Sequence, residues 1–458
     1  MIQTDGLTGN TFLLVEKSKE ELIEEILRLR QKVQELEKEM ETLKQKKGSE
    51  ALEVTALKRK LKRRWKKLGR PVGHPGITRH KPEFIHHTIH QTLTHCPDCG
   101  QDTLTELASE LEEHIQEDIV PAKVEATRFF RHGYWCSNCR KKKTAPYALE
   151  EVPYGYLGPN VLVQTILLKY HHGLPYSKIR VLFQELCGLK VTDSALAQAL
   201  QRLAKWLKVE EEIILKAIRK AAWIHGDETG WKIAGVLHWF WVFVNRRLAL
   251  YRIRRSRGRK VPEEILTSDF QGITVSDFLS AYDRTGRRRQ RCLVHLDREI
   301  KNIRDPSPEY QMARRKLGRI LTEAHRLDRE RGKLAPWVFH RRMHFLKERL
   351  FHLACYPFSN PHWKRLSKRL LKYYREILTF LEVPGLPSNN NHAERMIRPN
   401  VIFRKISFQN MSPKGAEAHE VLMSLLQTLR LQDRNITHFF KTAYLKHRQG
   451  NPIPILSL

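Results

Sequence analysis

Two aspartates stand where metal-dependent chemistry on phosphodiesters would need them. Asp227 ends the short apolar run of WIHGDETGW, and Asp277 follows the β-rich run QGITVS. Two adjacent carboxylates can hold a pair of divalent ions about 4 Å apart, which activate the attacking oxygen and stabilise the leaving one. Hard Mg²⁺ takes such oxygen ligands. Either aspartate alone could equally be a helix cap or a surface ion-pair partner, so the fold must bring the two together.

A third carboxylate is best sought in the segment LPSNNNHAERMIRPNVIFRK. Ser388 or Asn389 can cap a short helix there, Pro399 would end it, and Glu394 lies in its middle. The basic residues around this acid suit an electropositive surface beside a scissile phosphate: Arg395, Arg398, Arg404 and Lys405. The alternative is a surface pair between Glu394 and Arg398, worth only a few tenths of a kcal/mol.

The elements that would position these acids follow from apolar periodicity. GVLHWFWVFVN and LALYRIR predict a hairpin that turns at Asn245-Arg246-Arg247, and RCLVHLDREI predicts a further strand entering a helix. Three antiparallel strands followed by alternating strands and helices are the order of a ribonuclease H-like domain. Asp227 on the first strand and Asp277 on the fourth would then lie side by side. The rival acids are Glu228, Asp269, Asp283 and Asp297, of which Glu228 would face away from Asp227 on the same strand.

Two CxxC pairs predict a zinc ribbon ahead of this domain, because four thiolates suit tetrahedral Zn²⁺. The ligands would be Cys96, Cys99, Cys136 and Cys139, holding one structural ion, with Lys141 and Lys142 available to DNA. Cysteines used in this way fit a reducing cytosol better than a disulfide framework. We expect the other three, Cys187, Cys292 and Cys355, to be ordinary buried residues.

The N-terminal arm predicts oligomerisation and contact with phosphates. From Leu22 to Leu43 apolar residues recur in steps of four and three, a heptad seam that favours a parallel dimeric coiled coil, although a single amphipathic helix would show the same pattern. The stretch LKRKLKRRWKKLGR follows. It could bind phosphates without sequence preference or be a solvated linker, and its candidate residues are Lys58, Arg59, Lys60, Lys62, Arg63 and Arg64.

Between the ribbon and the strands, residues 158–222 have helical periodicity with a break at Cys187-Gly188-Leu189. Thr192 or Asp193 would cap the helix after this break. The two helices could form a helix-turn-helix that points residues 194–201 toward DNA, or a plain helical hairpin.

Composition identifies the class of partner. Lys and Arg number 82 against 50 acidic residues, a net charge of +32, which implies a polyanion such as nucleic acid. No apolar run is long enough to span a membrane, and the first residues do not resemble a signal peptide, so we expect a cytoplasmic protein.

These segments together predict a multidomain protein of mixed α+β and α/β class. Its parts would be a coiled-coil helix (15–47), a basic linker (48–82), a zinc ribbon (83–150), a helical region (151–222), the ribonuclease H-like core (223–304 and 388–415), a helical insertion (305–387) and a C-terminal helical tail (416–458).

Several stretches occur in the order seen in transposases of insertion-sequence family sixty-six, which the chain resembles over nearly its whole length. They are GRPVGHPG, HCPDCG with WCSNCRKKK, HHGLPYSKI, HGDETGWKIAG with LHWFWVFV, SDFLSAYD, RCLVHLDREIKNI and NNNHAERMIRPNVIFRK. The resemblance implies that Asp227, Asp277 and Glu394 are the catalytic DDE acids holding two Mg²⁺ or Mn²⁺ ions. It also implies cutting at element ends, then strand transfer by the freed 3′-OH.

The resemblance extends to Cys292-x-x-His295, which is similar to a CxxH signature near the active sites of several transposase groups. His295 would then touch DNA or support the site, unless it is a satisfied structural histidine. The chain departs from the family in SFQNMSPKGAEAHE, where a glycine-rich stretch is typical, and in its short C-terminal tail.

The implied partners are element ends and target DNA, a second copy of the chain, and accessory proteins of the same element. Two other functions fit the same sequence: a catalytically silent DNA-binding repressor derived from a transposase, and a metal-dependent nuclease or resolvase that cuts without joining.

Overall fold

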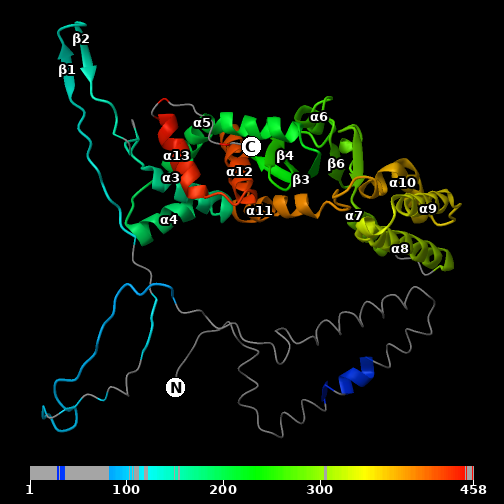
Figure 1. Ribbon diagram of the computed structural model, residues 1–458, viewed down its shortest axis with the longest axis horizontal. Helices are drawn as coiled ribbons and strands as arrows, with labels where there is room; N and C mark the ends of the chain where they lie inside the picture. The colour runs from blue at the N-terminus through cyan, green and yellow to red at the C-terminus, as the bar shows by residue number, and fades with distance from the viewer. Residues whose placement is uncertain are drawn as a thin grey trace. The chain divides into compact units, whose positions relative to one another are not determined.

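The computed structural model describes residues 28–29, 31–36, 82–102, 104–105, 107, 113–117, 122–148, 150–152, 155–303, 307–448, 450 and 456 (Figure 1). The chain forms two compact units, residues 1–121 and 122–458. Most of the predicted coiled coil and the basic residues 58–64 lie outside the described residues, although 28–29 and 31–36 are helical. Within the described ranges no helix is long and apolar enough to cross a membrane.

The second unit is built on a mixed five-stranded sheet. Its strands are β3 (Trp223–Ile233), β4 (Val236–Val244), β5 (Ala249–Arg254), β6 (Ile273–Ser276) and β7 (Arg288–Arg291). The spatial order is β5-β4-β3-β6-β7. β3, β4 and β5 pair antiparallel, whereas β6 runs parallel to both β3 and β7. The predicted hairpin and the predicted adjacency of the first and fourth strands are therefore confirmed.

Four helices enclose this sheet. α5 (Asp193–Arg219), α11 (Asn391–Ser407) and α12 (Pro413–Leu431) contribute buried side chains to the same core as β4 and β5, and α6 (Lys260–Leu266) follows β5. Figure 1 shows α5 and α11 with the strands between them. The core contains Trp231, Phe240, Trp241 and Phe243, all fully buried. Aromatic and β-branched residues on neighbouring strands thus make one continuous apolar layer.

The edge strand β5 is sealed by side chains of α12. Thr428 Oγ1, Ser424 Oγ and Glu420 Oε1 accept hydrogen bonds from the backbone N–H groups of Ala249, Tyr251 and Ile253, at 3.0, 2.9 and 2.7 Å. The spacing matches because four helical residues and two strand residues each span about 6 Å. The C-terminal region therefore completes the sheet by covering an edge that would otherwise be open to pairing.

The helical region before the sheet begins with α3 (Pro159–Ile166), continues as a π-helical turn, η2 (Leu167–His171), and turns into α4 (Tyr176–Cys187). Gly188 ends α4 in the left-handed conformation (φ 70°), and Thr192 Oγ1 caps α5 by accepting from Ala195 N, as predicted. Buried residues run along α5 from Leu196 to Ile218. α5 is therefore a long core helix rather than a short helix standing apart from the sheet.

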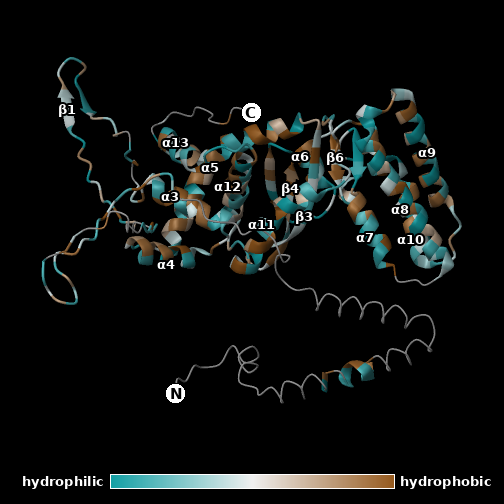
Figure 2. Ribbon diagram, turned by 60° about the horizontal axis from the view of Figure 1, so that its bottom comes forward, coloured by the Kyte–Doolittle hydropathy of each residue, from teal (hydrophilic) through white to brown (hydrophobic). Residues whose placement is uncertain are grey.

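Residues 308–377 form three helices whose apolar core also includes residues of strand β6. They are α8 (Pro308–Arg329), α9 (Pro336–Cys355) and α10 (Pro361–Ile377), with short 3-10 turns η4 (Arg331–Lys333) and η5 (Thr379–Leu381). Their apolar faces pack with β6 and with α7 (Leu293–Asn302). Hydrophilic and hydrophobic bands alternate along α8 and α9 in Figure 2, as the helical period requires. A final helix, α13 (Ile436–Arg448), also contributes to the main core.

Several local predictions were wrong, among them one on Pro399 and one on the free cysteines. Pro399 does not end its helix but lies inside α11, because Ala393, Ile397, Asn400 and Phe403 are buried on both sides of it. Tertiary packing thus outweighs the roughly 3 kcal/mol that an interior proline costs a helix. Cys355 and Cys187 were expected to be buried, yet Cys355 is exposed at the end of α9 and Cys187 is only partly buried at the end of α4.

Candidate active site

The register of two parallel strands aligns Asp227 with Asp277. His225 on β3 pairs with Val275 on β6, and this is the last pair of that ladder. Asp227 and Asp277 each lie two residues beyond it, so they occupy equivalent positions on neighbouring strands. Parallel neighbours are about 4.8 Å apart, and residues in the same register point to the same face. Both carboxylates are partly buried.

The residue before Asp227 is a glycine because the ring of Tyr282 fills the space beside it. Tyr282 lies in a short 3-10 turn, η3 (Ser280–Tyr282), and a Cβ added at Gly226 would stand 2.5 Å from its Cε1. Glu228 lies on the same face of β3 as the Tyr282 ring. There it pairs with Arg257 at 2.9 Å and lies 3.5 Å from the Tyr282 hydroxyl. The predicted alternation holds: Glu228 is on the face opposite Asp227.

Asn390 attaches the start of α11 to the carboxylate strand. Its Nδ2 donates to the Gly226 carbonyl at 2.8 Å, and its Oδ1 accepts from His225 Nδ1 at 3.1 Å. Its backbone N–H donates to Cys292 Sγ at 3.2 Å. Asn390, not Ser388 or Asn389, is the N-cap residue, so Glu394 lies in the first turn of α11 rather than in its middle. The helix thus starts at β3 and carries Glu394 toward the aspartates.

Asp227 is partly buried among other acids. Burial, together with the charges of Glu228, Asp277 and Glu394, raises the pKa of Asp227 to about 8. A hydrogen bond from the Glu228 backbone N–H to Asp227 Oδ1 opposes this shift only in part. Carboxylates held together away from water repel one another, and a divalent cation is what such a donor set fits.

Arg291 contacts the loop that carries Asp277. Its side chain is fully buried, ion-paired with Asp283 at 2.6 Å and with Glu376 at 2.7 Å. Its Nη1 donates to the Asp277 carbonyl at 2.9 Å, while the Leu279 N–H donates to Asp277 Oδ1 at 2.9 Å. Sequence reasoning missed Arg291, because it stands in the strongly basic run GRRRQRC, which reads as DNA-binding surface.

The rival acids are otherwise engaged or remote from the pair. Asp283 is neutralised by Arg291, Lys372 and the Tyr373 hydroxyl, and these partners hold its pKa below the usual range against its burial. Asp297 pairs with Lys301 at 2.5 Å on the surface of α7, and Asp269 is exposed in the loop before β6. None of the three shares the position of Asp227 and Asp277.

His295 approaches the third acid. Its Nδ1 lies 3.6 Å from Glu394 Oε1, and Cys292 caps the same helix, α7. Cys292 is buried, which raises the pKa of its thiol. Among the ion pairs of the described residues, none joins Glu394 to Arg398, so the surface pair is not what occupies this acid.

The predicted DNA-binding residues of α11 differ in exposure. Arg395, Arg398 and Lys405 are exposed. Arg404 instead donates to the Gly230 carbonyl and lies 3.4 Å from Thr229 Oγ1, so it fastens α11 to β3. Lys141 and Lys142 are exposed on β2 (Lys141–Thr144).

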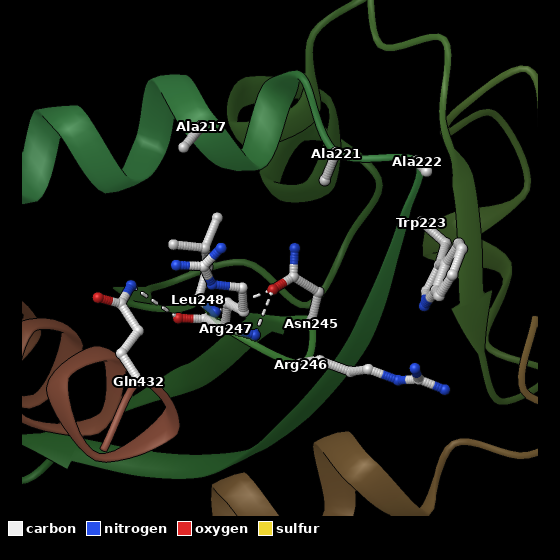
Figure 3. Close-up of a pocket in the computed structure, with 9 residues that line it drawn as sticks. All are labelled: Ala217, Ala221, Ala222, Trp223, Asn245, Arg246, Arg247, Leu248 and Gln432. Carbon is white, nitrogen blue, oxygen red and sulfur yellow. Dashed lines mark hydrogen bonds between the residues drawn. The ribbon is translucent and has the colours of Figure 1, made fainter. Parts of the chain in front are cut away.

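A pocket of about 330 Å³ has a lining that includes none of the three acids (Figure 3). It is lined by the end of α5, the β4–β5 turn, Trp223 and Gln432. Gln432 Nε2 donates to the Arg247 carbonyl, and Asn245 O accepts from His392 of α11. Its lining contains no carboxylate, so it cannot be the metal site.

Each CxxC pair forms a tight turn in its own unit. Gly100 N donates to Cys96 O at 2.8 Å, and backbone hydrogen bonds from Cys99 and Asp98 lower the pKa of the Cys96 thiol. In the second unit, Cys136 ends β1 (Gly133–Cys136), which pairs with β2, and backbone and thiol hydrogen bonds from Cys139 lower its pKa. Both turns thus favour thiolates, the form that binds metal.

Comparisons with known proteins agree with this arrangement. Residues 154–418, more than half of the chain, match the model of the IS66 transposase family, and residues 94–140 match that of the zinc-finger binding domain of IS66 transposases. Two uncharacterized proteins of Sinorhizobium fredii are similar. One, y4hP, is 22% identical over 386 residues, covering 74% of this chain and 68% of the relative. The other, y4jD, is 25% identical over 350 residues, covering 69% and 67%. The chain therefore belongs to the IS66 family of transposases.

Proposed function

We propose that the protein is a DNA transposase that cleaves the ends of its element and joins the freed 3′-OH to target DNA, using Asp227, Asp277 and Glu394. The observation that carries this proposal is that Asp227 on β3 and Asp277 just after β6 each lie two residues beyond the last pair of the parallel β3–β6 ladder. The strand order β5-β4-β3-β6-β7 supports a ribonuclease H-like core interrupted by the helices of residues 308–377.

Each residue would have a distinct role. Asp227 and Asp277 would bind two divalent ions from one face of the sheet, and Glu394 would add a carboxylate from α11. Mg²⁺ or Mn²⁺ held there would supply Lewis-acid stabilisation of the attacking and leaving oxygens. Arg291 keeps Asp277 in place, and Asn390 keeps the start of α11 against β3. Exposed Arg395, Arg398 and Lys405 would contact the DNA backbone.

The remaining parts would serve DNA binding and assembly. We propose that Cys96, Cys99, Cys136 and Cys139 hold one zinc ion, supported by the zinc-finger match and by thiols whose surroundings favour ionisation. The N-terminal heptads would pair two copies, and the basic stretch of residues 57–70 would add phosphate contacts. The segment boundaries deduced from the sequence are part of the same proposal.

A strand-transfer assay with the element's own ends tests this function. With Mg²⁺ or Mn²⁺ the wild-type chain should cut and join, whereas Asp277→Asn should lower joining by at least about 10²-fold. Asp269→Asn is the matched control, because it removes the same charge from an exposed loop next to β6. Cutting without joining would favour a nuclease, and end binding without cutting would favour a silent repressor.

A further inference from the structure

Three side chains of different chemistry converge beside the carboxylates. Cys292 Sγ, a ring nitrogen of His295 and a carboxylate oxygen of Glu394 all lie within 4.8 Å of one another. Cys292 and His295 stand at the start of α7, and Glu394 stands in the first turn of α11. About a hundred residues, including α8, α9 and α10, separate the two helix starts along the chain.

Two atoms of this cluster have no hydrogen-bond partner although water cannot reach them. They are His295 Nδ1 and Glu394 Oε1. The side chains as a whole are 33% and 34% exposed, so only these inward atoms are enclosed. At 3.6 Å they are too far apart for a good hydrogen bond to each other. A buried polar atom without a hydrogen-bond partner is unfavourable, so two such atoms that lie close together indicate a missing shared partner.

We propose that Cys292, His295 and Glu394 bind a zinc-class divalent cation, in addition to any ions at Asp227 and Asp277. A sulfur, a nitrogen and one oxygen form a borderline-soft donor set, which selects Zn²⁺ over Mg²⁺. Ligands at about 2.0–2.3 Å from a tetrahedral ion stand roughly 3.3–3.8 Å apart. The His295–Glu394 separation already falls in that range, so closure requires only a small movement of the Cys292 thiol.

The surroundings of the sulfur fit this role. The Asn390 backbone N–H donates to Cys292 Sγ at 3.2 Å, the kind of outer hydrogen bond that orients a metal ligand. The Leu293 N–H donates to the Ser388 carbonyl at 3.1 Å, so the two helix starts are already joined through their backbones. A fourth ligand position would remain for water.

A cation at this point would fasten α7 to α11 across the insertion. It would also fix Glu394 through Oε1. The site is chemically distinct from the aspartate pair, which offers oxygen only, and from the CxxC turns, which offer sulfur only. The proposal therefore stands whether or not the aspartates perform strand transfer.

Zinc content of the full chain tests the proposal directly. After dialysis against metal-free buffer, we expect about two zinc ions per wild-type chain, one of them in the cysteine turns. His295→Ala should retain about one, and Cys96→Ser combined with Cys99→Ser should also retain about one, because each removes a different site. Cys355→Ser is the control for losing a thiol outside the cluster, and it should keep both.

A conservative variant separates the loss of a zinc ligand from the loss of the folded structure. His295→Cys keeps a zinc ligand, so it should hold about two ions even where His295→Ala unfolds. Equal zinc content in the wild type and a folded His295→Ala chain would overturn the proposal, as would a folded His295→Cys chain that has lost one ion. A different result would contradict the transposase proposal: Asp277→Asn would still join DNA ends, and its zinc content would be unchanged.

Discussion

Asp227 on β3 and Asp277 after β6 occupy equivalent positions two residues beyond the last hydrogen-bonded pair of their strands. This register places two carboxylates on one face at the spacing of adjacent strands. Burial and the other acids around Asp227 raise its pKa to about 8, so the fold assembles the site against electrostatic repulsion.

Removing one charge should stabilise the metal-free protein. Because the folded-state pKa of Asp227 is raised, its contribution to stability is fully present below the unfolded value near 3.8 and is lost as pH rises through about 8. At pH 9 in the presence of a chelator, Asp227→Asn should therefore raise the free energy of unfolding by about 1–2 kcal/mol. Urea unfolding measures this free energy, and the control Asp269→Asn should change it little. A destabilised Asp227→Asn chain would contradict the electrostatic argument.

Divalent-ion affinity should depend on pH through the same group. Mg²⁺ binds the ionised carboxylate, so affinity should increase between about pH 6 and pH 8, with release of a proton on binding. Calorimetric titration in buffers of different ionisation enthalpy would count that proton. The wild-type pH dependence should flatten in Asp227→Asn. If the affinity of the wild-type chain for Mg²⁺ did not change across this pH range, Asp227 would already be ionised without the metal.

Arg291 is expected to act as a positioning residue. It is buried, paired with Asp283 and Glu376, and donates to the Asp277 carbonyl. In Arg291→Met, Asp283 keeps Lys372 and Glu376 keeps Arg289, but the buried guanidinium that joins the two acids is lost. The chain should be destabilised by about 1–3 kcal/mol, because charged groups lose hydrogen bonds. In Arg291→Lys, which keeps the charge but not the fork of donors, the Mg²⁺ concentration for half-maximal joining should rise. Arg287→Met, an exposed change in the same basic run, is the control and should leave that concentration unchanged.

The seal between α12 and β5 should contribute measurably to stability. Ser424→Ala removes the acceptor of the buried Tyr251 N–H and should lower the free energy of unfolding by about 1–3 kcal/mol. Thr428→Val tests the neighbouring bond to Ala249 in the same way. Glu417→Ala lies on the exposed side of α12 and should have almost no effect. Equal effects from all three changes would argue against a specific edge seal.

The sequence predicted the β4–β5 hairpin from the apolar runs of those two strands, and β6 from its β-branched residues. It misplaced the fifth strand, because β7 (Arg288–Arg291) has no apolar residue and the apolar part of RCLVHLDREI already belongs to α7. Alternation along β3 predicted that Asp227 and Glu228 face opposite sides, and the order of strands predicted that β3 and β6 are neighbours. These are local or near-local patterns. They locate the aspartates without knowledge of the rest of the fold.

Contacts between distant segments could not be predicted in the same way. Nothing in GRRRQRC distinguishes buried Arg291 from exposed Arg287, because burial depends on α10 and on the loop after β6. Likewise, Ser424 and Thr428 look like ordinary helix residues until β5 lies beside them. The prediction that Pro399 ends its helix was wrong for the same reason. Packing on both sides of Pro399 maintains α11 where local propensity predicts the end of a helix.

Sulfur substitution at the scissile phosphate tests the central claim most directly. End DNA carrying sulfur at a non-bridging oxygen of that phosphate should be cut poorly with Mg²⁺ and recover with the softer Mn²⁺, because the ions that we propose Asp227, Asp277 and Glu394 to hold would contact that position. Asp277→Asn and Glu394→Gln should abolish the recovery. Equal cutting of the sulfur and oxygen substrates in Mg²⁺, or recovery that survives Asp277→Asn, would contradict metal binding by these three acids.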